Sequence, residues 1–148
     1  MIVVAQRCSE AKVLVHEKII AKIKSGLMLL VGVRKGDEYS EVDKVIDKVI
    51  NLRIFNDENG KMNLSILDTK GSLMVISQFT LCGDIRKGRR PSFINAENPR
   101  RGLEVYKYMV NKFRDKGIKT VTGEFGAMMD IDLINQGPAT FIIDSKEL

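Results

Sequence analysis

The stretch Leu73-Met74-Val75-Ile76-Ser77-Gln78-Phe79-Thr80-Leu81 is the most apolar strand candidate in the chain, and it decides the fold. It begins with four consecutive apolar residues, which is typical of a buried strand. The segment that follows, Gly83–Asn98, carries glycine, proline and a cluster of basic residues, a composition typical of an exposed loop. The sequence therefore predicts a buried strand that runs directly into a positively charged loop.

The first third of the chain is rich in strand signals. Short apolar runs, separated by polar or glycine-containing breaks, occupy Ile2–Cys8, Lys12–His16, Ile19–Ile23 and Leu27–Val33. His16-Glu17-Lys18 resembles the tip of a hairpin, and Asn56–Gly60 is a turn cluster. These patterns predict several short strands ahead of the buried one.

Two helices are predicted from the spacing of apolar residues. The first opens at Ser40, and Asp43 three residues later completes a weak capping box. Its inward face comprises Val42, Val45, Ile46, Val49, Ile50 and Arg53. The second helix begins at Asn98-Pro99, an N-cap followed by proline at the first helical position, and stops near Gly117. Its inward residues are Leu103, Tyr106, Val110 and Phe113.

The end of the chain returns to strand patterns. The expected strands are Ile118–Thr122, roughly Ala127–Ile134, and Ala139–Asp144. The chain shows no internal repeat, low-complexity segment or linker. Residues 1–148 are therefore predicted to form a single β-rich α/β domain with about two helices.

Composition narrows the class of protein. The chain has 148 residues, of which 44% are hydrophobic and 29% charged, as in ordinary globular domains. No apolar run approaches the ~20 residues of a membrane span, and Met1–Arg7 lacks the features of a leader, so a cytoplasmic protein that binds no membrane is expected. Cys8 and Cys82 are predicted to be reduced thiols. They lack the spacing of metal-binding cysteines and His16 is the single histidine, so no metal or cofactor is predicted.

A basic cluster accounts for much of the net charge of +5. It comprises Arg86, Lys87, Arg89, Arg90, Arg100 and Arg101, against the single acid Glu97. Such a patch suits a phosphate backbone, and Arg86, Lys87, Arg89 and Arg90 are the candidate RNA-binding residues. The alternative is that these basic side chains only face solvent and bind no phosphate.

The segment Asn135-Gln136-Gly137-Pro138-Ala139-Thr140 places a Gly-Pro pair between two strand-like runs. Proline removes a backbone N–H, and the glycine before it tolerates backbone angles that other residues avoid. A trans-proline turn that ends a strand is one interpretation. The other is a cis bond, which X-Pro peptides adopt at a cost of only about 0.5–1 kcal/mol.

The end of the buried strand is the main candidate for chemistry. Ser77–Leu81 presents two hydroxyls and an amide beside the basic loop. Hydroxyls and backbone N–H groups can stabilise the oxyanion that develops during ester hydrolysis. The alternative is that Ser77 and Thr80 are ordinary strand-edge hydroxyls with satisfied hydrogen bonds.

Four segments together resemble the D-aminoacyl-tRNA deacylase family over essentially the whole chain. In order, they are Ser77–Leu81, Gly83–Phe93, Gly123–Met129 and Asn135–Thr140. The opening Val-Ala-Gln-Arg and the strand Gly-Leu-Met-Leu-Leu-Val-Gly-Val are also similar to that family. The resemblance implies a largely antiparallel, barrel-like sheet, a homodimer, and aminoacyl-tRNA rather than DNA as the partner.

The resemblance also implies a site. A cis Gly137-Pro138 bond would enter the partner subunit's active site and act there with the Ser-Gln-Phe-Thr-Leu strand on the aminoacylated 3′ adenosine of tRNA. The catalytic candidates are Ser77, Gln78, Phe79 and Thr80, and the substrate-binding candidates are Asn135, Gly137, Pro138, Thr140, Phe125 and Met129. Phe125 and Met129 would receive the adenosine. The chain departs from the family pattern at Gln136, Ala139 and Cys82, which bears on fine substrate preference.

The mechanism that these residues favour is hydrolysis by positioning. A serine triad is not expected, because His16 lies at a predicted hairpin tip. Water would attack an oriented ester, with help from the ribose 2′-hydroxyl as the family's mechanism suggests, and a stiff Gly-Pro backbone would exclude L-amino acids but admit glycine. The alternatives are a non-catalytic RNA-binding module and a general ester hydrolase with Thr80 or Ser77 as nucleophile.

Overall fold

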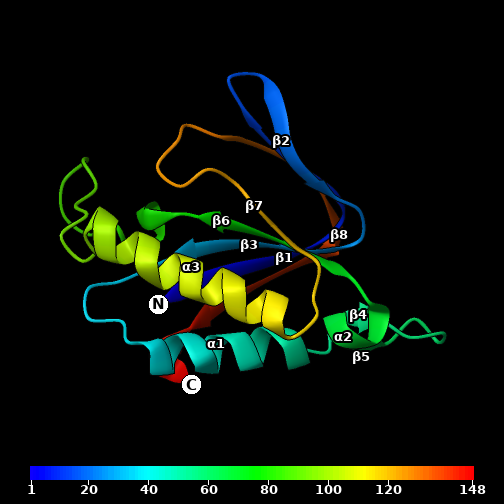
Figure 1. The fold of residues 1–148 in the computed structure, drawn as a ribbon. Coiled ribbons are helices and arrows are strands. Elements are labelled where there is room, and N and C mark those ends of the chain that lie inside the picture. Colours follow the sequence, from blue (N-terminus) through cyan, green and yellow to red (C-terminus); the bar gives the residue numbers. More distant parts are fainter.

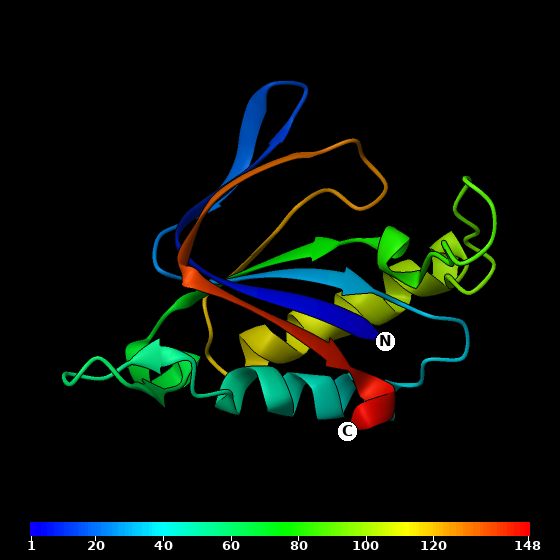
Figure 2. The same cartoon turned by 180° about the vertical axis from the view of Figure 1, so that it is seen from behind.

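The computed structural model describes residues 1–148 and shows a curled, mixed sheet with two long helices on one face (Figures 1 and 2). The strands are β1 (Ile2–Val15), β2 (Lys18–Ile23), β3 (Gly26–Gly32), β4 (Phe55–Asn56), β5 (Met62–Leu64), β6 (Ser72–Ser77), β7 (Thr120–Thr122) and β8 (Asp130–Asp144). The helices are α1 (Tyr39–Asn51), α2 (Ile66–Thr69) and α3 (Pro99–Asp115), with 3₁₀ turns η1 (Phe79–Cys82) and η2 (Ser145–Glu147).

Strand β1 is the centre of the sheet. It pairs antiparallel with β8 along one edge, and with β3 and then β2 along the other. The strand order is β2-β1-β3-β6-β7, and β6 runs parallel to both β3 and β7. The predicted barrel-like sheet is confirmed, with a parallel part formed by β3, β6 and β7.

The central strands are buried on both faces because alternate side chains enter two different cores. In β6, Leu73 and Val75 pack toward the helices, whereas Met74 and Ile76 pack inside the curl of the sheet. Continuous apolar runs are what such doubly covered strands require. The predicted buried strand is therefore confirmed, but β6 ends at Ser77 because its neighbour β3 ends at Gly32.

Helices α1 and α3 form one layer over the sheet (Figure 1). The predicted inward residues of α1 are buried up to Ile50, but Arg53 is exposed because the helix ends at Asn51. The predicted Ser40 cap is wrong: the N-cap is Glu38, two residues earlier, and the Glu41 carboxylate accepts a 2.8 Å hydrogen bond from the Glu38 N–H. In α3, Asn98 caps the helix as predicted by accepting from the Arg101 N–H at 3.0 Å.

Two predicted breaks in strands are absent. The runs before and after Ser9 merge into β1, where shifts of register near Cys8 let one strand contribute to both cores. The last two predicted strands are likewise one strand, β8. The hairpin tip is confirmed, with positive φ at His16 and Glu17. The short helix α2 and the β4–β5 hairpin were not predicted.

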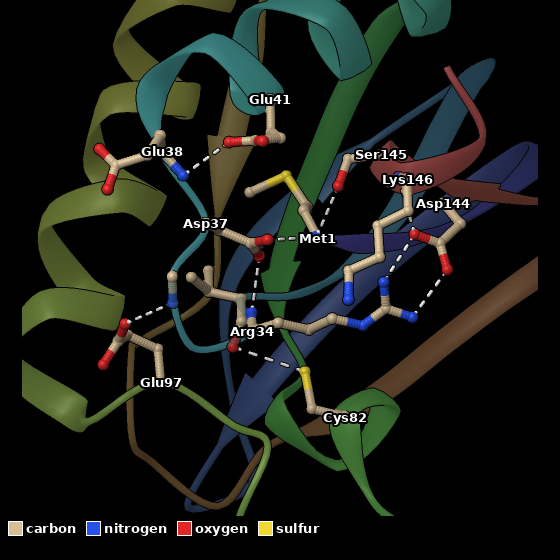
Figure 3. A network of polar contacts seen from close by, with 12 residues as sticks. Met1, Arg34, Asp37, Glu38, Glu41, Cys82, Glu97, Asp144, Ser145 and Lys146 are labelled. Atoms are coloured by element: carbon tan, nitrogen blue, oxygen red, sulfur yellow. Dashed lines mark hydrogen bonds and ion pairs between the residues drawn. The ribbon is translucent and has the colours of Figure 1, made fainter.

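A polar network ties the end of β8 to the loop after β3 (Figure 3). Asp144 accepts two hydrogen bonds from the Arg34 guanidinium, at 2.6 and 2.7 Å. Asp37 accepts from the Arg34 backbone N–H at 2.7 Å and from the Met1 amine at 2.6 Å. The same loop is held to Glu97, whose carboxylate accepts from the Gly36 N–H at 3.4 Å. The network therefore fixes the loop beside the cavity described below.

None of the helices combines the length and the apolar character that a bilayer crossing would need.

Acid is expected to weaken the fold through Asp144. The Arg34 guanidinium holds the pKa of the Asp144 carboxyl at about 2, below its ordinary 3.8. Because the pKa is lower in the folded state, the stabilisation is fully present above about pH 4 and is lost as the pH falls toward 2. We expect Asp144→Asn to lower the free energy of unfolding at neutral pH by about 1–2 kcal/mol, and to flatten its decline between pH 4 and pH 2.

Asp84→Asn is the matched control for this titration. The pKa of Asp84 is also held at about 2, chiefly by Arg86, but that ion pair is exposed and screened by solvent. Chemical denaturation across the pH range should therefore show a smaller change for Asp84→Asn. Identical pH profiles for wild type and Asp144→Asn would contradict the prediction.

Candidate active site

A cavity of about 610 Å³ opens at the carboxyl ends of the parallel strands β3 and β6. Its walls come from the end of β6, the turn η1, the N-terminus of α3 and the loop 125–129. Ligand sites in sheets with parallel strands commonly lie at this end, where the chain leaves the strands. The predicted site residues Ser77, Gln78, Phe79, Thr80, Phe125 and Met129 all line this cavity.

The β6 side of the cavity carries the polar groups. Gln78 follows the last residue of β6, and its N–H donates to the Val31 carbonyl at 2.7 Å. The chain then turns into η1, so that Phe79 is 55% exposed and Thr80 is also exposed. The Gln78 side-chain amide donates to the Thr80 hydroxyl. Since Phe79 and Thr80 begin η1, their N–H groups have no acceptor within that turn.

The opposite side of the cavity is the loop that carries Phe125 and Met129. The Phe125 ring packs on Tyr106 of α3, with ring centroids 5.7 Å apart. Gly123 makes room for Met129, because a Cβ at residue 123 would overlap the Met129 sulfur. The result is an apolar wall that faces the hydroxyls of the β6 end.

Sequence reasoning missed the part of the cavity that α3 supplies. Glu97, Asn98, Pro99 and Gly102 line it at the start of that helix. The Asn98-Pro99 pair identified the helix start, but nothing in the sequence placed that start beside β6. The Glu97 carboxylate accepts from the Asn98 N–H at 2.7 Å and from the Asn98 side-chain amide at 2.8 Å.

The electrostatics of the cavity offer no activated side-chain nucleophile. Glu97 is the only ionisable residue that lines it, and its carboxylate accepts hydrogen bonds from Gly36 and Asn98 rather than from Thr80 or Ser77. His16 lies at the β1–β2 hairpin tip, outside the cavity. Burial raises the pKa of the Cys82 thiol, which donates to the Val33 carbonyl at 3.4 Å. The cavity therefore places no base beside the Thr80 or Ser77 hydroxyl.

No group of three or more His, Cys, Asp or Glu side chains is placed to hold a metal ion. The predicted absence of a metal and of a cofactor stays a prediction.

The Gly137-Pro138 pair lies outside this cavity, in a bulge of β8. Its peptide bond is cis, so the trans-turn interpretation is wrong. Thr140 pairs with Gln6 and Asn135 with Cys8, so residues 136–139 stand opposite Arg7 alone. A bulge accommodates proline, which has no N–H to give to the ladder, and lets the strand continue.

Arg7 holds the bulge in place. Its side chain is buried, and its Nε donates to the Gln136 carbonyl at 3.1 Å. The other end of the guanidinium donates to the Ile54 carbonyl at 2.6 Å and to the Asn56 side chain at 3.2 Å. The guanidinium therefore bridges the bulge and the β4 strand.

Asn135 and Thr140 brace the base of the same bulge. The Asn135 amide donates to the Thr140 hydroxyl at 2.9 Å and accepts from the Ala139 N–H at 3.1 Å. These contacts leave Gly137 and Pro138 exposed at the tip. Within one chain, the bulge and the cavity are therefore separate features.

The basic loop lies at the rim of the site. Arg86, Lys87, Arg89 and Arg90 are exposed and do not line the cavity. Arg86 pairs with Asp84 at 2.6 Å, whereas the other three have no carboxylate partner. Phe93 of this loop packs edge-on against Phe79, with centroids 5.0 Å apart, which ties the loop to the cavity wall.

Sequence comparisons give concordant relatives. The family model described as D-Tyr-tRNA(Tyr) deacylase matches residues 4–144. A D-aminoacyl-tRNA deacylase of Geobacillus sp. (strain WCH70) is 52% identical over 147 residues, which cover 99% of this chain and 97% of the relative. A D-aminoacyl-tRNA deacylase of Aquifex aeolicus (strain VF5) is 49% identical over 145 residues, covering 98% of each chain.

Solved structures share the fold. The c-Myc DNA unwinding element binding protein superposes with a TM-score of 0.92 and 32% identity, over 97% of this chain and 98% of the other. A probable eukaryotic D-amino acid tRNA deacylase superposes with a TM-score of 0.81, over 96% of this chain and 97% of the other. At 15% identity, that second likeness concerns the fold alone.

Proposed function

The chain belongs to the D-Tyr-tRNA(Tyr) deacylase family, and we propose that its cavity is the site where it hydrolyses the ester between a D-amino acid and the 3′ adenosine of tRNA. The protein is thus a hydrolase that acts on aminoacyl-tRNA. The observation that carries the assignment to the cavity is that Ser77–Thr80 and Phe125–Met129, far apart in sequence, face each other across one space. Phe125 and Met129 would receive the adenosine, and the β6 end would receive the ester.

Catalysis in this proposal is by orientation and charge stabilisation. Water attacks the ester carbonyl, the bond to the ribose oxygen breaks, and the free amino acid and tRNA leave. The Thr80 and Ser77 hydroxyls and the free N–H groups that begin η1 stabilise the oxyanion. An oriented ester also loses much of the entropic barrier to attack. The lack of a base beside Thr80 supports water, assisted by the ribose 2′-hydroxyl, as the nucleophile over the threonine itself.

Chiral selection is assigned to Gly137 and Pro138 of a second subunit. Both residues are exposed at the tip of the β8 bulge and outside their own cavity, so they are available to a neighbour. Ile134 and Ile142 on either side of the bulge are 60% and 76% exposed, which suits burial in a homodimer. A backbone wall excludes a side chain more stiffly than another side chain would, because it has fewer ways to move aside.

Matched D- and L-aminoacyl-tRNA test this function directly. Release of free amino acid should be fast from the D-ester and negligible from the L-ester. A glycyl ester should also be hydrolysed, because glycine has no side chain for the wall to exclude. Equal rates for the two enantiomers, or no release from either, would overturn chiral proofreading. Binding of tRNA without hydrolysis would favour the RNA-binding module instead.

Thr80→Ala separates the two hydrolytic mechanisms. If water attacks, we expect kcat to fall by about 10²–10³-fold, the usual cost of one lost oxyanion donor, because the backbone N–H of residue 80 is kept. Loss of a true nucleophile reduces kcat by up to about 10⁶-fold. Single-turnover release of D-amino acid measures the difference, and Ser92→Ala, outside the cavity, is the control. Trapping of an acyl-enzyme in the wild type would contradict the water mechanism.

The basic loop is proposed to guide tRNA to the cavity. Lys87, Arg89 and Arg90 have no acid partner, so their charge is available to phosphates. We place the protein in the cytoplasm, where tRNA is charged and used.

A further inference from the structure

A second cavity, of about 310 Å³, lies beside the first along α3. One wall is a single face of that helix, with residues three or four positions apart: Leu103, Lys107, Val110, Asn111 and Arg114. The other wall consists of Thr122, Gly123 and Phe125, at and just after β7. The second cavity is therefore a groove between α3 and β7.

Phe125 is the wall that the two cavities share. Its ring is held against Tyr106, whose hydroxyl donates to the Val75 carbonyl at 2.7 Å. The shared wall is thereby anchored to β6 through α3. An extended ligand that occupies the first cavity beside Phe125 reaches the second by passing this one ring.

The second cavity is lined by positively charged side chains and by polar side chains that could bind a ligand. Lys107 and Arg114 line it together with no acidic residue. Neither cation forms an ion pair, and Arg114 donates only to the Thr120 carbonyl, at 3.3 and 3.4 Å. The Asn111 amide and the Thr122 hydroxyl complete a lining suited to an anion with a polar, flat substituent.

We propose that this second cavity binds the nucleotide that precedes the terminal adenosine of tRNA, with Lys107 and Arg114 on the phosphate that joins the two. The inference rests on the proposed function, which puts the adenosine against Phe125. Lys107 and Arg114 line the second cavity without an acidic residue, so both positive charges are available to the single phosphodiester that joins adjacent nucleotides. The two cavities adjoin at the Phe125 ring, and an aromatic ring can stack on any base. Two adjacent nucleotides can therefore place one base in each cavity.

Two minimal substrates test the proposal: the D-tyrosyl ester of adenosine, and the D-tyrosyl ester of cytidylyl-(3′→5′)-adenosine. We expect kcat/KM at low salt to be about tenfold or more higher for the dinucleotide ester, because only it carries the phosphate. In Lys107→Gln this ratio should fall by about fivefold, and in the Lys107→Gln/Arg114→Gln double variant it should approach one. The logarithm of this ratio should fall linearly with the logarithm of the salt concentration, and removing each cation should make that slope less negative by about 1.

Lys44→Gln, which removes one exposed charge from α1, is the matched control and should keep the wild-type ratio. Equal hydrolysis of the two esters by the wild type would overturn the inference. So would a ratio that is lost in Arg89→Gln/Arg90→Gln but kept in the Lys107 and Arg114 variants, since the basic loop would then hold this phosphate. Hydrolysis of neither ester would instead overturn the proposed function, and the inference with it. Because the readout is a ratio within one protein sample, partial loss of folded protein does not imitate it.

Discussion

Gly137→Ala is expected to lower kcat/KM for D-aminoacyl-tRNA by about 100-fold or more. Gly137 has φ +121°, a conformation that residues with a side chain rarely adopt. A Cβ at this position would also lie 2.5 Å from an Arg7 guanidinium nitrogen. Either the bulge or Arg7 must move, and a shift of about 1 Å at a positioning element is enough for a loss of this size.

Gly60→Ala is the matched control for Gly137→Ala. Gly60 also has a positive φ, of +73°, but nothing lies within 4 Å of a Cβ built there. It belongs to the turn between β4 and β5, outside the cavity. We expect Gly60→Ala to reduce stability slightly and to leave kcat/KM unchanged. Equal activity of Gly137→Ala and wild type would remove the bulge from the proposed site.

Arg7→Ala is expected to reduce both stability and activity. Arg7 is 5% exposed, and its removal leaves the buried carbonyl of Ile54 and the part-buried carbonyl of Gln136 without this donor. Hydrogen bonds to charged groups contribute about 1.5–3 kcal/mol each, so we expect the free energy of unfolding to fall by about 3 kcal/mol or more. Freed from the guanidinium, the bulge should also lose its fixed position, and kcat/KM should fall at least tenfold.

A double-mutant cycle separates the two roles of Arg7. In the Arg7→Ala background the clash at Gly137 is absent, so Gly137→Ala should reduce kcat/KM less than it does in wild type. Arg53→Ala, which removes an exposed arginine, controls for the loss of charge. Urea denaturation measures stability, and D-aminoacyl-tRNA hydrolysis measures activity. Additive effects of the two substitutions would contradict direct coupling between the guanidinium and the bulge.

The sequence predicts the local elements of this fold better than their connections. The apolar spacing of α1 and the Asn98 cap of α3 are local signals, and the structure confirms both. The breaks expected near Ser9 and at Gly137-Pro138 are wrong, because pairing between β1 and β8 carries both strands through residues that would otherwise end them. Ladder hydrogen bonds with a distant strand outweigh local propensity at such positions.

The site was predicted in pieces. The hydroxyls at the end of a buried strand indicate Ser77–Thr80, whereas Phe125 and Met129 follow only from the resemblance to a family, and the structure brings the two segments together at one cavity. The contribution of α3 was missed because Glu97 and Asn98 reach the cavity only through tertiary packing of the helix on the sheet. Arg7 was missed as well, since nothing local indicates that an arginine in an apolar strand opposes a bulge near the other end of the chain.

The pairing of β1 with β8 also governs how the molecule folds. Ile2 pairs with Asp144, so the sheet is completed by contacts between residues at opposite ends of the sequence. Folding rates fall as contacting residues become more distant in sequence, and we expect slow folding for a domain of this size. During synthesis, one edge of β1 stays unpaired until β8 leaves the ribosome, and an open apolar edge invites association with other chains. Strand β8, which covers this edge of β1, also carries Gly137 and Pro138. The proposed chiral filter therefore forms only when the fold is complete.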